Sequence, residues 1–167
     1  MIRLSGFALL SGLLMASASC GSDGAKPVPP GHQAPESQGS LDLETLVQQS
    51  IPGQGGQTVR EVIRDQAAWT AMWAKLREGS SLPETPPAVD FTKDMVIVAA
   101  METQPCVSKV TVRSAVESGG ELVVGILEAP PAPNCVCFTA ERPIHVVRLR
   151  KVDGPARFDV ERGQTPC

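Results

Sequence analysis

Cysteine is the residue type in this sequence whose spacing points most directly to chemistry. The chain has 167 residues and five cysteines, and the first of them, Cys20, stands far from the other four. It follows an apolar run (residues 6–15) and four small residues (16–19). Small residues before a cysteine leave room for a lipoprotein-type peptidase, after which the thiol can carry a diacylglycerol. We therefore expect Cys20 to become the lipidated N-terminus of an exported bacterial protein.

Residues 1–19 are interpreted as a signal peptide rather than as a membrane anchor. Their apolar run is too short to span a bilayer, which takes about 20 residues, and Arg3 supplies a positive start. The alternative is an ordinary secretory signal cleaved after Ala18, because residues 16–18 form an A-x-A-like site. A second acyl chain would make the attachment stable, and Gly21 after the cysteine favours the outer membrane where the cell has one.

The other four cysteines are predicted to form two disulfide bonds. Cys106, Cys135, Cys137 and Cys167 are an even set in an exported domain. The C-x-C pair is too far apart in an extended chain to bond to itself. A hairpin expected before it favours Cys106–Cys135 with Cys137–Cys167, and Cys106–Cys137 stays open. A zinc site or a redox pair is a weaker alternative, because both prefer C-x-x-C spacing, and we predict no metal and no cofactor.

No group of residues in the sequence predicts catalysis. The two histidines are His32, in a polar segment, and His145, where a partly buried structural role is expected. There is no H-E-x-x-H, no G-x-S-x-G and no phosphate-binding loop. We therefore predict no catalytic residue. An enzyme or small-ligand protein stays open as an alternative, in which Glu102, His145 and an arginine of the same strand would converge in a cleft.

The charge of the chain argues against nucleic acid as a partner. The formal net charge is −3, and loss of residues 1–19 removes one basic residue, Arg3, and no acidic one. A general nucleic-acid binder needs a basic surface that displaces counterions. Basic residues are frequent only in the C-terminal part, where most of them belong to a solvated face. Arg148 and Arg150 are nevertheless our candidates for contact with a protein partner, because arginine is enriched at interfaces.

Composition divides the mature chain into a tether (residues 20–40) and one domain (41–167). The tether is rich in Gly, Pro, Ser and Gln and has no aromatic residue, so we expect it to be disordered. The domain contains one predicted helix, which Asp65 can cap. Its apolar residues follow a helical spacing, and Gly79 can end it. The residues of this apolar stripe, which we expect in the core, are Trp69, Met72, Trp73 and Leu76.

The remaining pattern predicts strands joined mostly by short turns. Residues 43–49 and 58–64 are expected to form a hairpin, as are 107–116 and 121–127 around Gly119-Gly120. Residues 95–101 form a continuous apolar run, typical of a strand buried on both faces, and 143–152 are expected as the last strand. The predicted fold class is α+β, mainly antiparallel β in a sandwich or open barrel with one amphipathic helix packed on the sheet.

Three stretches in fixed order resemble the C-terminal domain of PrcB-type lipoproteins. They are residues 62–73 (VIRDQAAWTAMW), residues 86–100 (PPAVDFTKDMVIVAA) and the surroundings of residues 139–147 (TAERPIHVV). The resemblance covers residues 41–152 and implies a lipoprotein subunit of a surface protease complex. Family members usually carry P-T-G-G-Y after the buried strand, where this chain has residues 103–107 (TQPCV).

These features together predict a non-catalytic accessory lipoprotein that binds and stabilises another envelope protein, with a protease as the first candidate. The main alternative is a small-ligand-binding protein or an uncharacterised hydrolase that uses a pocket of the sheet. A structural protein of the cell envelope with no dedicated partner is a third reading.

Overall fold

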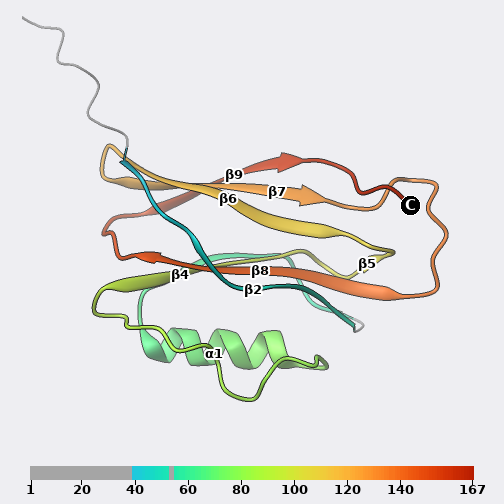
Figure 1. Cartoon of the computed structure of the whole chain (residues 1–167), viewed down its shortest axis with the longest axis horizontal. Coiled ribbons are helices and arrows are strands. Elements are labelled where there is room, and N and C mark those ends of the chain that lie inside the picture. Colours follow the sequence, from blue (N-terminus) through green and yellow to red (C-terminus); the bar gives the residue numbers. More distant parts are fainter. Residues whose placement is uncertain (1–38, 53–54) are drawn as a thin grey trace, which may run out of the picture. The chain divides into compact units, whose positions relative to one another are not determined.

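The computed structural model of the chain describes residues 39–52 and 55–167 (Figure 1). Two β-sheets face each other, and a helix covers the outer side of the second sheet. Neither sheet closes into a barrel, so the domain is a sandwich with a third, helical layer. The predicted fold class is confirmed.

The two sheets are built mainly from antiparallel pairs. The first has the order β1 (Gly39–Ser40), β6 (Lys109–Ser118), β7 (Glu121–Ala129) and β9 (Ala156–Arg162). The second has the order β2 (Glu44–Pro52), β8 (Ala140–Arg150), β4 (Asp94–Ala100) and β3 (Val59–Ile63), with β5 (Gln104–Pro105) paired to β8. The β7–β9 pair is parallel.

The central strands of the second sheet, β8 and β4, are buried on both faces because this sheet is the middle layer. Alternate residues of β4 serve the two cores: Ile97 packs toward the first sheet, and Val96 and Val98 pack toward the helix. This explains the continuous apolar run, since both faces of β4 pack against a hydrophobic core. The prediction of a strand buried on both faces is confirmed.

Helix α1 (Gln66–Arg77) begins and ends as its sequence indicates. The Asp65 carboxylate accepts a 2.8 Å hydrogen bond from the Ala68 N–H, and Gly79 has a φ of +70°. All four residues of the predicted stripe are buried against the second sheet. The indole N–H groups of Trp69 and Trp73 donate to the backbone carbonyls of Pro87 and Pro83, each at 3.0 Å.

Three expectations about the strands are corrected. Segments β2 and β3 do not form a hairpin, because β2 pairs with β8 and β3 pairs with β4. Residues 156–162 form a further strand, β9, so β8 is not the last. Gly39 and Ser40, which were assigned to the tether, pair with β6. The hairpin of β6 and β7 around Gly119-Gly120 is confirmed.

Candidate functional site

Three exposed apolar side chains lie next to the two cysteines of one disulfide bond at one end of the sandwich. Val107 is 66% exposed, Val136 is 84% exposed and Phe138 is fully exposed. They flank the disulfide between Cys106 and Cys137 in the sequence, and we call this group the apolar tip. Soluble proteins rarely leave an aromatic ring and two valines in water at one place, so the tip is the first candidate for an interaction surface.

Three segments far apart in the sequence meet under the apolar tip. The loop after β7 meets the C-terminal segment, because the backbone N–H of Thr165 donates to the Pro130 carbonyl at 2.9 Å. The Thr165 hydroxyl donates to the Val107 carbonyl at 2.6 Å, which ties in the segment after β5. The Cys106 N–H donates to the Thr139 carbonyl at 3.2 Å. Hydrogen bonds therefore connect the backbone segments that carry the apolar tip to one another and to the C-terminal segment.

Two disulfide bonds complete this support, and their pairing differs from the favoured prediction. Cys106 is bonded to Cys137 and Cys135 to Cys167, with Cα–Cα distances of 5.1 and 5.4 Å. The prediction that all four cysteines form disulfides is confirmed, whereas Cys106–Cys135 with Cys137–Cys167 is wrong. The reason is that the C-terminal segment runs beside the loop after β7, where Thr165 pairs with Pro131, and this brings Cys167 to Cys135.

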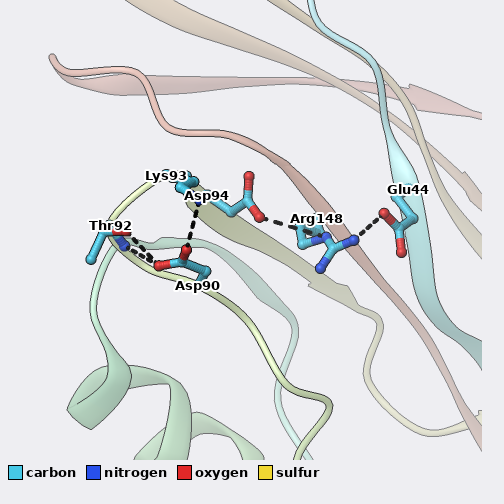
Figure 2. A network of polar contacts seen from close by, with 6 residues as sticks. All are labelled: Glu44, Asp90, Thr92, Lys93, Asp94 and Arg148. Atoms are coloured by element: carbon cyan, nitrogen blue, oxygen red, sulfur yellow. Dashed lines mark hydrogen bonds and ion pairs between the residues drawn. The ribbon is translucent and has the colours of Figure 1, made fainter.

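Arg148 is engaged in a network of polar contacts within the domain (Figure 2). Its guanidinium forms a hydrogen-bonded ion pair with Glu44 and lies 3.8 Å from a carboxylate oxygen of Asp94. Glu44, which hydrogen-bonds the guanidinium, is the main cause of the raised pKa of Arg148. Beside it, the Asp90 carboxylate accepts from the backbone and hydroxyl of Thr92, which lowers the pKa of Asp90.

Arg150 also has an acidic neighbour, since its guanidinium lies 3.1 Å from Glu117. It stands at the opposite end of β8 from Ala140, a distance of about 33 Å at about 3.3 Å per residue. Arg148 and Arg150 therefore mark one end of the sandwich and the apolar tip marks the other. A role of the two arginines in partner contact stays a prediction.

Glu102 and His145, which would converge in a cleft if the chain were an enzyme, lie apart. Glu102 lines a cavity of about 230 Å³ with Arg60 and Glu128, which are joined by an ion pair. His145 does not line this cavity. His145 is 3% exposed, and its ring forms hydrogen bonds with the Val112 backbone N–H and the Thr45 hydroxyl. The structure thus places Glu102 and His145 in different surroundings.

Two further features bear on the predicted sites. Within residues 39–52 and 55–167, no three His, Cys, Asp or Glu residues are grouped so that they could hold a metal ion. No helix in that part of the chain is long and apolar enough to cross a membrane. Cys20, the predicted lipidation site, and His32 lie outside the described residues.

The sequence reasoning missed the apolar tip although a signal for it exists. Val136 and Phe138 alternate with the cysteines in C-V-C-F, directly after a Pro-rich loop. Apolar residues that alternate with disulfide-bonded cysteines in a loop have little chance of reaching a core. Comparisons of the chain with protein-family models, with curated proteins and with solved structures found no match in any of the three.

Proposed function

We propose that this chain is a non-catalytic lipoprotein of the bacterial envelope that binds and stabilises another exported protein through the apolar tip. The exposure of the tip carries this proposal. Of the four large apolar side chains exposed in the described part of the chain, three belong to the tip, and the fourth is Val160. Aromatic anchors surrounded by smaller contacts dominate the binding energy of protein interfaces. Phe138 has the chemistry of such an anchor, and an apolar pocket on the partner would fit it.

The support below the tip favours binding by a preformed surface. The two disulfides close overlapping stretches of chain, 106–137 and 135–167, and hydrogen bonds from Thr165 hold the loop and the C-terminal segment together. A surface that is already ordered loses less conformational entropy when it binds. The exposed apolar side chains would otherwise only lower solubility.

The position of the tip suits a module anchored by its N-terminus. Gly39, the first described residue, pairs with Glu117 beside the turn between β6 and β7. The tip lies beyond the opposite ends of these strands, where Lys109 pairs with Ala129 (Figure 1). A lipid on Cys20 and a tether would therefore leave the tip free to face a neighbour on the same membrane, at high effective concentration.

A protease is the first partner to test, because of the resemblance to PrcB-type lipoproteins. Cys106 offers one structural argument for that resemblance. Its φ is +67°, a left-handed conformation that favours glycine. The family carries a Gly-Gly pair in this turn, so the backbone shape fits the family turn although the residue differs.

The test is quantitative affinity capture of the full chain from detergent-solubilised envelopes. Val136→Ser with Phe138→Ser should abolish the enrichment of the partner by more than tenfold, because the anchor is lost. Val160→Ser removes an exposed valine on β9 and is the matched control, which should capture the partner normally. Arg148→Glu with Arg150→Glu tests the other end of the sandwich.

Deletion of the gene for this chain should also lower the abundance of the captured partner, whether or not that partner is a protease. Identical capture profiles for the chain and for the Val136/Phe138 variant would contradict the proposal. Sedimentation of the chain with lipid vesicles, lost in the same variant, would assign the tip to a membrane surface instead. A substrate turned over by the purified chain would establish the enzyme reading.

A further inference from the structure

A groove between strand β3 and helix α1 is a second candidate binding site. β3 is the end strand of its sheet, and no strand in the described part of the chain pairs with its outer edge. A cavity of about 420 Å³ lies between this strand and the helix, within the usual range of ligand sites. Val59, Met72 and Leu76 give it an apolar wall.

Arg142 lies at the head of the groove and is buried, with 9% of its surface exposed. Its Nη2 donates to the Gln57 carbonyl at 2.8 Å and its Nε to the Met101 carbonyl at 3.2 Å. Among the described residues no carboxylate forms an ion pair with it. Burial lowers the pKa of Arg142, but an arginine side chain stays charged in proteins. The groove therefore contains a buried positive charge to which the described residues offer no negative partner.

Gly56 shapes the chain around this guanidinium. A Cβ at Gly56 would lie 2.7 Å from Nε of Arg142, and its φ of +111° also favours glycine. The glycine thus allows the backbone to approach the arginine closely. The described residues offer no acceptor to Nη1 of Arg142, so this nitrogen is available to a ligand.

The other charged residues of the groove indicate which class of ligand it can bind. Lys75 adds a second, exposed cation, while Glu61 and Glu78 are exposed carboxylates on the same groove. Water screens exposed charges, whereas the buried charge of Arg142 is screened much less. The two carboxylates disfavour a polyanion such as a nucleotide. A ligand with one carboxylate, nearby N–H donors and an apolar group matches the groove better.

We infer that this groove binds the C-terminal tail of an extended peptide, which adds as a strand to the free edge of β3. The terminal carboxylate lies on Arg142, and the last side chain, which is apolar, packs against Met72 and Leu76. The unpaired backbone groups of an edge strand supply hydrogen bonds to such a peptide, and side-chain pockets supply specificity. This site is separate from the apolar tip and does not depend on the proposed function.

The decisive experiment measures the binding of two peptide probes to the full chain, without substitutions, in detergent micelles. The first is a fluorescent hexapeptide pool that ends in a free leucine, valine or phenylalanine, and the second is the same pool with C-terminal amides. Fluorescence anisotropy should show binding of the acid pool and at least about tenfold weaker binding of the amide pool, since a charge-assisted hydrogen bond is lost. Equal binding of the two pools, or no binding of either, would overturn the inference.

Variants and a small competitor locate the site. Lys75→Gln changes an exposed residue of the groove and should weaken binding of the acid pool about threefold, as expected for a partly screened charge. Lys109→Gln changes an exposed lysine of β6 and should have no effect. Arg142→Gln should abolish the preference for acid over amide, and Arg142→Lys should restore part of it. Displacement of the peptides by N-acetyl-leucine at equal affinity would show a site for small carboxylates and would overturn strand addition.

Discussion

The backbone N–H of Val112 donates a 2.8 Å hydrogen bond to Nδ1 of His145, and this bond joins the two sheets of the sandwich. Because Nδ1 accepts, the proton of the neutral ring must lie on Nε2, which faces the Thr45 hydroxyl at 3.0 Å. The donor lies beside an irregularity of β6, between Val112 and Ser114. His145 thus satisfies a buried backbone group and is a structural residue.

The burial of His145 makes stability depend on pH. Burial, and secondarily the charge of Lys109, lowers the pKa of His145 below its ordinary value of 6.5. Below pH 6.5 the unfolded chain therefore binds a proton that the folded chain does not, and stability falls as pH falls. Above pH 6.5 the ring is neutral in both states and contributes no pH dependence. We expect a lower free energy of unfolding at pH 5.5 than at pH 7.5.

Chemical denaturation at the two pH values checks this expectation. His145→Gln removes the titrating ring, so the loss of stability between pH 7.5 and pH 5.5 should be smaller in the variant than in the unchanged chain. His32 is present in both proteins, so any contribution from it cancels in the comparison. An equal loss in both proteins would show that His145 does not cause the pH dependence.

The elements that local residues determine were predicted correctly. Helix α1 carries its own cap, apolar stripe and stop at Asp65, Trp73 and Gly79. The β6–β7 hairpin carries its own turn at Gly119-Gly120. In both cases the residues that specify the structure are neighbours in the sequence, so their pattern can be interpreted without knowing the rest of the fold.

The pairing of β2 and β3 shows where local signals fail. The glycine-rich segment between them is typical of a hairpin turn, yet β4 and β8 lie between them in the sheet. Those two central strands are the more buried ones, since both of their faces are covered. The more polar β2 and β3 are therefore edge strands, where a face or an edge meets water. Which strands take the central positions depends on all strands of the sheet, so it cannot be inferred from two neighbouring segments alone.

The error in the disulfide pairing follows from the strand that the sequence did not reveal. β9 has mostly exposed residues and a weak alternation, so nothing marked it as part of a sheet. It runs parallel to β7, and the chain after it stays beside the loop that follows β7, where Thr165 forms a bridge with Pro131. That path brings Cys167 to Cys135 and leaves Cys137 for Cys106.

The two disulfides are expected to contribute similarly to stability and differently to binding. The bonded cysteines are 31 and 32 residues apart, so in the chain-entropy model each bond stabilises the fold by about 3–4 kcal/mol. Urea denaturation of Cys106→Ser/Cys137→Ser and of Cys135→Ser/Cys167→Ser should show comparable losses. The first pair adjoins all three residues of the apolar tip, whereas the second adjoins only Val136, so removal of the first pair should weaken partner capture more.

Peptide mapping without reduction checks the pairing itself. The expected cross-linked peptides join Cys106 to Cys137 and Cys135 to Cys167. A peptide that joins Cys106 to Cys135 would contradict the structure. Equal partner capture by the two double variants, at temperatures where both are folded, would contradict the distinct role of the first bond.

The proposed lipid anchor at Cys20 would set the orientation of the apolar tip. Cys20 follows small residues and a short apolar run, a pattern that suits a lipoprotein peptidase. Cys20→Ala should leave an uncleaved precursor and abolish labelling by a fatty-acid analogue, because no thiol is available for the diacylglycerol. Cys167→Ser is the matched control and should be labelled and processed normally, since Cys167 lies in the folded domain. Cleavage of the Cys20→Ala chain after Ala18, with release from the membrane, would show an ordinary secretory signal instead. If the apolar tip binds a partner as proposed, the Cys20→Ala chain should capture it in detergent as well as the unchanged chain does, but it would lose the effective concentration that a shared membrane gives.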